Sequence, residues 1–147
     1  MYFRKFKLRF VDTYKFFLSP LADLSKTYDI NTIKGYFPHH VNLPENQNYV
    51  GRYLSVDYYG PKNMAPDKIA EFNKWYTRVK NDVFDFQKEC KKYCLLDVEL
   101  LAKAILKYRH IFRTTKDLDP FRYVTLPSMT KDMFLNKYLP KDTIVGN

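Results

Sequence analysis

The sequence predicts a mixed α/β chain in which helices dominate and strands are few. Apolar side chains recur every three or four residues over 66–79 and over about 86–112, which is the spacing of amphipathic helices. Apolar and basic side chains instead alternate over 6–10, a pattern typical of a half-buried strand. Hydrophobic residues make up 46% of the 147-residue chain, which argues against disorder. We therefore expect a single folded domain over residues 1–147.

The N-terminal part of the chain is expected to hold this strand, a short helix and a long loop. The basic N-terminus would also suit a cleaved targeting segment, but the alternation over 6–10 favours the strand. Ser19 and Pro20 are a typical N-cap residue and first helical residue. Residues 31–64 lack sustained periodicity, which predicts a long loop with at most short strands. The apolar face of the short helix would comprise Leu21, Leu24 and Tyr28.

Three further helices are expected after this loop. Pro66 opens the first, and the second, from about Phe86 to Phe112, is the longest. A last short helix would begin at Ser128 and end before Pro140. The apolar faces of the first two comprise Ile69, Phe72, Tyr76 and Val79, and then Cys94, Val98, Leu101, Ile105, Tyr108 and Phe112.

The composition narrows the classes of function. Lys and Arg number 25 against 16 Asp and Glu, a formal net charge of +9, which favours nucleic acid or an acidic membrane face as the partner. No apolar run approaches the roughly 18 residues that a transmembrane segment needs. Four glycines leave no room for a Gly-rich nucleotide loop. Two cysteines cannot form a disulfide framework, so we expect a reducing compartment.

Tyr93 and Asp97 are the main candidates for chemistry. They stand four residues apart, so their hydroxyl and carboxylate lie one helical turn apart, beside the apolar stripe. A carboxylate can hold Mg²⁺ through oxygen, and a phenol can orient a metal-bound water for attack on a phosphodiester. From the spacing alone, a capped or salt-bridged surface aspartate near a packed tyrosine is the commoner arrangement. Zinc binding by Cys90 and Cys94 with a histidine of the 31–64 loop is a weaker alternative to buried free thiols.

Longer segments extend this pair into a family resemblance. Phe84–Glu89, Tyr93–Cys94 and Asp97–Leu101 together resemble the third exonuclease motif of family B DNA polymerases, above all the protein-primed branch of phages, adenoviruses, transposons and linear mitochondrial plasmids. The resemblance covers about residues 8–145. Further matching segments, in the family's order, are Val11–Phe16, Leu21–Tyr28, Lys34–His39, Met64, Trp75–Tyr76, Thr125–Ser128, Phe134 and Leu139–Pro140.

The resemblance implies a fold, and a role for each matching residue. The fold would be part of a ribonuclease H-like (DnaQ-like) exonuclease domain, with one edge of the sheet, an insert loop at about 31–64 and a linker toward the palm at about 115–147. Asp97 would be a metal ligand of the 3′→5′ exonuclease, Tyr93 would orient the attacking water, and Lys34 would stabilise charge on the scissile phosphate. The residues contacting the single-stranded DNA primer end would be Thr13, Tyr14 (in place of the family's aliphatic residue), Phe37 and His39.

The leading hypothesis is a fragment of a DNA-directed DNA polymerase. In the family the other metal-binding carboxylates lie N-terminal to the matching segments, and the polymerase site lies C-terminal to them. Mg²⁺ is therefore expected in the intact parent only, and we expect this chain alone to bind no cofactor and to be inactive. Two alternatives remain: a remnant subunit with protein or RNA partners, for example in a mitochondrial ribosome or respiratory complex, or a non-catalytic nucleic-acid-binding protein. A mitochondrial location is favoured over a viral or cytoplasmic one.

Overall fold

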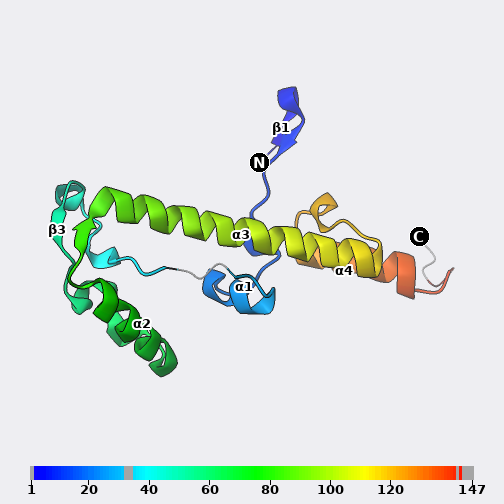
Figure 1. The fold of residues 1–147 in the computed structure, drawn as a ribbon. Coiled ribbons are helices and arrows are strands. Elements are labelled where there is room, and N and C mark those ends of the chain that lie inside the picture. The colour runs from blue at the N-terminus through cyan, green and yellow to red at the C-terminus, as the bar shows by residue number, and fades with distance from the viewer. Residues whose placement is uncertain (1, 32–34, 142, 144–147) are drawn as a thin grey trace. The chain divides into compact units, whose positions relative to one another are not determined.

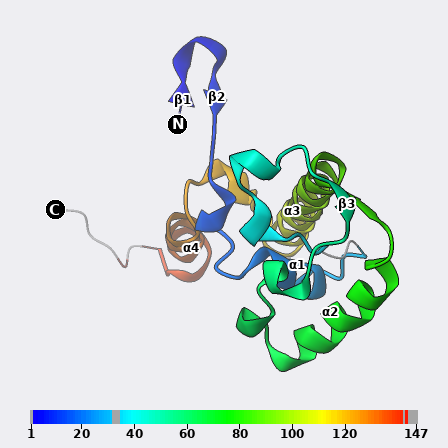
Figure 2. The same ribbon diagram turned by 90° about the vertical axis from the view of Figure 1, so that its left-hand side faces the viewer.

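The computed structural model describes residues 2–31, 35–141 and 143. The chain divides into two compact units: Met1–Ile30 with Ala102–Asn147 form the first, and Asn31–Leu101 form the second. Helices dominate the described residues, as the sequence predicts (Figures 1 and 2). That the chain forms a single domain stays a prediction. The elements are α1 (Leu21–Thr27), α2 (Pro66–Val79), α3 (Phe86–Lys116), α4 (Leu126–Met133), β1 (Tyr2–Phe3), β2 (Leu8–Arg9), β3 (Val50–Arg52) and β4 (Val83–Asp85).

The first unit begins with an antiparallel hairpin of β1 and β2, in which Tyr2 lies opposite Arg9. The prediction of a strand is confirmed at Leu8 and Arg9, but the prediction that it is half-buried is wrong. Phe6, Leu8 and Phe10 are 65%, 52% and 59% exposed. A two-stranded hairpin has no inner face of its own, and in the part of the chain that the structure describes no second layer covers it.

A small aromatic core holds the rest of the first unit together. Tyr108 of α3 contacts the rings of Phe16 and Phe17 at centroid distances of 6.2 and 5.0 Å. Burial raises the pKa of Tyr108 to about 12. Lys107 donates hydrogen bonds of 2.7 and 2.6 Å to the carbonyls of Tyr28 and Asp29, where α1 ends. Other buried residues of this unit are Leu24, Ile30, Ala104, Leu118, Pro120 and Met129.

Two predicted helix starts in this unit need correction. Pro20 is itself the N-cap of α1, one residue later than predicted, and Ser19 makes no capping bond. Helix α4 begins at Leu126, because Thr125 and Ser128 cap it reciprocally in a capping box. Ser128 is therefore the third residue of that helix. A π-helical turn, Phe134–Tyr138, continues α4, so the predicted end before Pro140 is confirmed.

The second unit packs β3 and β4 against aromatic side chains. The two strands pair antiparallel, with Gly51 opposite Phe84. Phe72 of α2 is fully buried and lies among other rings, as the predicted apolar face of that helix requires. The loop before α2 is confirmed for residues 35–64, which form short 3₁₀ turns and β3. The aromatic neighbours of Phe72 are Tyr36, Tyr59, Trp75 and Tyr76.

Helix α3 begins at Phe86 as predicted but ends at Lys116, beyond the predicted end at about Phe112, and the face that it buries is not the one predicted at its N-terminal half. Cys94 is exposed and Val98 is 65% exposed. The buried side chains instead recur at Phe86, Leu100, Ala104 and Tyr108, and the partly buried Tyr93 and Asp97 fall on the same line. Apolar residues occupy two neighbouring stripes of this helix, so periodicity could not choose between them. Because the stripe through Leu100 and Ala104 is the buried one, Tyr93 and Asp97 lie on the inward face of α3 rather than beside it.

Candidate functional site

Tyr93 and Asp97 are brought to the same inward face of α3 by the way in which this helix starts. Phe84 and Phe86 are both 1% exposed, which fixes the junction of β4 and α3 in the core of the second unit. The Asp85 carboxylate accepts a 3.1 Å hydrogen bond from the backbone N–H of Lys88, and this bond lowers the pKa of Asp85. With the rotation of the helix set there, Tyr93 and Asp97 are partly buried, and Asp97 Oδ1 is inaccessible to solvent.

The loop containing Phe37 and His39 packs directly on Tyr93. The ring of Tyr93 lies 5.5 Å from that of Phe37 and 5.3 Å from that of His39, centroid to centroid. Phe37 is 5% exposed and also contacts Phe86 at 5.5 Å. A Cβ added at Gly35 would lie 4.0 Å from the Tyr93 ring, so the backbone of the loop runs close to α3. The structure therefore brings three of the predicted site residues together.

The other side of this loop is held by α2. Tyr36 lies 5.1 Å from the ring of Phe72 and 4.9 Å from that of Trp75. Burial raises the pKa of the Tyr36 hydroxyl, and the nearby Glu71 carboxylate raises it further. The alternation of Tyr36 and Phe37 thus directs one ring to α2 and the next to α3. In the sequence analysis Tyr36 was assigned no part in the site. Its place between Gly35 and Phe37, inside the Lys34–His39 segment, was the only sign of such a part.

The carboxylates around Tyr93 do not suffice for a two-metal centre. Within the described ranges, no group of three or more His, Cys, Asp or Glu side chains could hold a metal ion. Asp97 supplies one oxygen ligand of the type that Mg²⁺ prefers, but phosphodiester hydrolysis with two ions needs several carboxylates together. The described residues therefore do not fit such a centre by themselves. Cys90 and Cys94 are free thiols. Burial raises the pKa of Cys90, and the neighbouring Cys94 raises it further.

Thr13 and Tyr14 belong to the first unit, whereas Phe37, His39, Tyr93 and Asp97 belong to the second. Lys34 lies outside the described residues. The side chain of Asp12 accepts a 3.0 Å hydrogen bond from the N–H of Tyr14 and so starts a 3₁₀ turn over Thr13–Lys15. Tyr14 is 69% exposed, which leaves its ring open to solvent.

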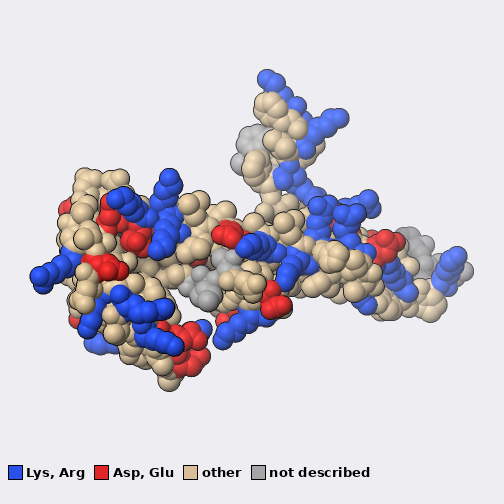
Figure 3. Space-filling view, viewed as in Figure 1, with Lys and Arg blue, Asp and Glu red and all other residues tan. Residues whose placement is uncertain are grey.

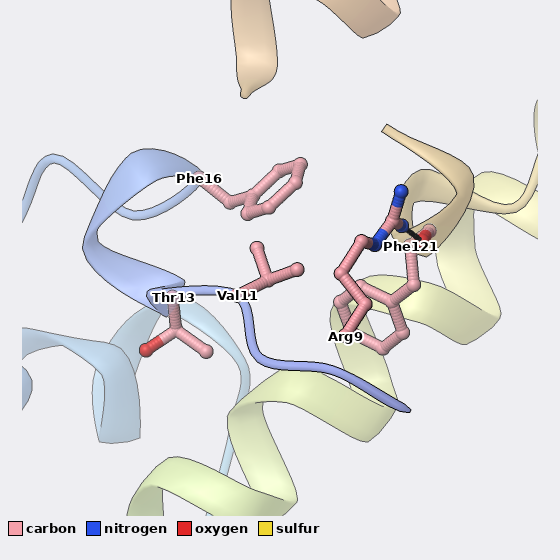
Figure 4. A pocket seen from close by; sticks show the side chains of 5 residues that line it. All are labelled: Arg9, Val11, Thr13, Phe16 and Phe121. Atoms are coloured by element: carbon pink, nitrogen blue, oxygen red, sulfur yellow. Dashed lines mark hydrogen bonds between the residues drawn. The ribbon is translucent and has the colours of Figure 1, made fainter. Parts of the chain in front are cut away.

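Thr13 lines a shallow cavity of about 310 Å³ in the first unit (Figure 4). Its wall is mainly apolar, formed by Val11, Phe16 and Phe121. Arg9 closes one side and donates hydrogen bonds to the carbonyls of the turn at 121–123. The sequence did not indicate this cavity, because Phe121 reaches it from the far end of the chain and no local pattern records that contact.

Comparison with known proteins places the chain among the DNA polymerases. It belongs to the family of type B DNA polymerases, organellar and viral, whose family profile matches residues 1–146. It is 30% identical over 145 residues to a probable DNA polymerase of Neurospora intermedia, covering 96% of this chain and 15% of that protein. Similar proteins, also described as probable DNA polymerases, occur in Ascobolus immersus (27% identical, covering 95% of this chain and 12% of that protein) and Podospora anserina (25%, covering 94% and 11%).

The family resemblance derived from the motifs is thereby confirmed. The chain spans only about an eighth of the length of these relatives, between 11% and 15% in the three named here. No solved structure matches it, and the ribonuclease H-like fold stays a prediction. Among the residues that the structure describes, no helix combines the length and the apolar character needed to cross a membrane.

Proposed function

We propose that this chain is a part of the 3′→5′ exonuclease region of a protein-primed type B DNA polymerase. One observation carries the proposal: Tyr93 and Asp97 lie on one inward face of α3, and the loop with Phe37 and His39 packs against it. Aromatic rings beside a hydroxyl and a carboxylate suit a site that holds the last bases of a single strand next to a scissile phosphodiester. Family membership supports DNA as the substrate.

Each residue of this face has a proposed task. The carboxylate of Asp97 would be one ligand of Mg²⁺, and the hydroxyl of Tyr93 would hold the attacking water in position. Phe37 and His39 would border the single strand. Because Asp97 is a single carboxylate, the chain alone should bind Mg²⁺ weakly and leave DNA intact. The further ligands would come from other segments of a longer polymerase, since the chain spans 15% of the Neurospora intermedia relative.

Thr13, Tyr14 and Lys34 also have proposed tasks in DNA binding. The hydroxyl of Thr13 suits a phosphate contact, and the exposed ring of Tyr14 suits stacking on a base. Lys34 would stabilise the charge that develops on the scissile phosphate. A mitochondrial location is a further part of the proposal, and an organelle is one of the two sources that the family description names.

A chimera tests the proposal directly. The 145-residue segment of the Neurospora intermedia polymerase that matches this chain is replaced by the chain, and excision is measured on 3′-labelled single-stranded DNA with Mg²⁺. We expect the chimera to excise nucleotides, Asp97→Asn to abolish excision, and Tyr93→Phe to reduce it by a factor of at least about 10. Asp82→Asn, a change at an exposed aspartate of the same unit, is the matched control and should have no effect.

Two outcomes would contradict the proposal. If the Asp97→Asn chimera excises nucleotides as fast as the unaltered chimera, Asp97 holds no catalytic metal. If the chain alone degrades single-stranded DNA and Asp97→Asn stops it, the proposed inactivity of the isolated chain is wrong. Native purification tests the alternative of a structural subunit. Stable retention of the chain in a large assembly without nuclease activity would favour that alternative.

A further inference from the structure

Two hydrogen bonds fasten the start of α3 to one short segment, Asn48–Arg52. The backbone N–H of Phe86 donates a 3.0 Å hydrogen bond to the carbonyl of Tyr49. The side-chain amide of Gln87 donates a 2.8 Å hydrogen bond to the side-chain oxygen of Asn48. The first N–H groups of a helix have no partner within the helix, so an outside acceptor at this point fixes the helix to the segment that supplies it.

Charged side chains contribute less to this attachment. Where α3 starts, basic and acidic side chains lie next to one another on the surface (Figure 3). The ammonium of Lys88 lies 3.1 Å from the Asp85 carboxylate, but the Lys88 side chain is 83% exposed. Exposed ion pairs contribute little to stability, and this one joins residues only three apart in the chain. It therefore does not fix α3 to another part of the unit.

Tyr49 joins the three elements that meet here. Its hydroxyl donates a 2.9 Å hydrogen bond to the carbonyl of Arg52, the last residue of β3. Its ring is partly buried, lies 6.2 Å from the ring of Phe84 in β4 and packs on the buried cluster that also contains Phe37 and Phe86. Since its carbonyl binds the first residue of α3, Tyr49 alone contacts β3, β4 and α3.

Gly51 leaves the space that the Tyr49 ring occupies. A Cβ added at Gly51 would lie 2.7 Å from the hydroxyl oxygen of Tyr49 and 2.9 Å from its Cζ. Both distances are shorter than van der Waals contact, which is why this close approach needs a residue without a Cβ. The backbone of Gly51 is held by its pairing with Phe84, so an added side chain would displace the ring and break its bond to Arg52.

The orientation of Tyr93 follows from the way in which α3 is held at its start. Residues 86–93 belong to one unbroken helix, so a rotation at Phe86 is carried along to Tyr93. A rotation of about 20° moves a group about 6 Å from the helix axis by about 2 Å. Misplacement by about 1 Å can cost about 100-fold in rate. A small rotation of the helix would therefore take the Tyr93 hydroxyl out of position.

We propose that Tyr49 is a positioning residue for Tyr93. With its ring over Gly51, it fixes the rotation of α3 and so holds the Tyr93 hydroxyl at the place where it orients the attacking water. The task of Tyr93 rests on the proposed function, whereas the effect of Tyr49 on α3 rests only on the contacts of Tyr49 and Gly51.

The signals of His39 in the proton NMR spectrum of the whole chain test the effect on α3. The ring of His39 lies 5.3 Å from that of Tyr93 and 5.5 Å from that of Phe37, so ring currents from both shift its signals. The sequence has three histidines, which makes these signals easy to assign. Tyr49→Leu and Gly51→Ala should each move the His39 signals toward those of a free histidine. Tyr49→Phe keeps the ring and should leave them nearly unchanged.

A double variant shows whether Gly51 acts through the ring of Tyr49. In a chain that carries Tyr49→Leu, Gly51→Ala should cause no further change in the His39 signals, because the ring that it would displace is gone. Val50→Ala is the matched control, since Val50 stands between these two residues in the chain and is 62% exposed. This change should leave the His39 signals where they are.

The chimera with the Neurospora intermedia polymerase tests the consequence for excision. Each variant is assayed at a temperature at which circular dichroism shows it to be folded. Tyr49→Leu and Gly51→Ala should lower kcat about 10-fold or more and change KM less than about 2-fold, because a displaced Tyr93 hydroxyl impairs the chemical step and not the binding of DNA. Tyr49→Phe should keep kcat within about 3-fold of the unaltered chimera.

Three results would overturn the inference. The first is unchanged His39 signals in Tyr49→Leu or Gly51→Ala. The second is an effect of Gly51→Ala that persists in the Tyr49→Leu chain. The third is a raised KM at unchanged kcat, which would mean that Tyr49 affects the binding of DNA and not the position of Tyr93. An unaltered chimera that does not excise contradicts the proposed function instead, and the His39 signals then still decide whether Tyr49 fixes α3.

Discussion

Phe37 should be the side chain that keeps the site loop on α3, and replacing it should detach that loop. Its ring is 5% exposed and contacts the rings of His39, Phe86 and Tyr93 at 5.5 Å each. Truncating a buried Phe to Ala costs about 3–5 kcal/mol, and each ring pair contributes about 0.5–1.5 kcal/mol beyond the area buried. Because a loop can relax around the cavity, we expect Phe37→Ala to lower the free energy of unfolding by about 3 kcal/mol.

The measurement is urea unfolding followed by intrinsic fluorescence, since Trp75 lies in the same unit as Phe37. Phe37→Leu keeps most of the volume and loses the ring contacts, so about 1 to 1.5 kcal/mol is expected. Phe6→Ala removes a ring of equal size that is 65% exposed, and should change stability by no more than about 0.5 kcal/mol. Hydrogen exchange should show faster exchange at the amides of 35–41 in Phe37→Ala.

The reasoning fails if Phe37→Ala costs as little as the exposed Phe6→Ala, or if the amides of the loop exchange at the same rate as before. Either result would mean that the contacts of Phe37 with Tyr93 and Phe86 do not hold the loop in place.

Three further changes test other parts of the structure. Arg109 donates hydrogen bonds of 3.1 and 2.6 Å to Asp119, which lowers the pKa of that carboxyl group. The pair therefore stabilises the fold fully above the ordinary pKa of 3.8, and this stabilisation is lost as the pH falls through the lower pKa of the folded state. Urea unfolding at about pH 7 should show Asp119→Asn to be about 1 kcal/mol less stable than the unaltered chain, with the difference shrinking toward about pH 3. Gly60 has φ +65, and an added methyl would lie 3.2 Å from Nε2 of His40, so Gly60→Ala should lower the unfolding free energy by about 1 to 2 kcal/mol in the same assay. Tyr93→Phe keeps the ring that packs on the loop, so thermal unfolding should show a change of at most about 1 kcal/mol even where chimera excision is lost.

Local patterns predicted the helices well. Pro66 does open α2, and Phe86 does begin the longest helix, because a proline at a first turn and a repeating apolar stripe act within a few residues. The boundaries were less accurate at α1 and α4, where the cap is decided by which side chain completes a hydrogen bond. At α4 this is Thr125, which shares a capping box with Ser128.

The candidate site could be predicted in its members but not in its arrangement. The spacing of Tyr93 and Asp97 correctly placed them one turn apart on the same helix. It did not show that they face inward, because α3 carries a second apolar stripe through Val98 that is left 65% exposed. Nor could any local pattern show that Phe37 would lie against Tyr93, since these rings are separated by more than fifty residues of chain.

The sequence by itself determined the helical segments, the basic charge and membership of the type B DNA polymerases, because charge follows from composition and the other two depend on residue order along the chain. Tertiary structure alone decided which face of α3 is buried, which loop covers Tyr93, and that the rings of the N-terminal hairpin stay exposed. The physical reason is the same in all three cases. An apolar stripe or an alternating strand lowers the free energy only by packing on a partner, and the partner is chosen by contacts between residues distant in the chain.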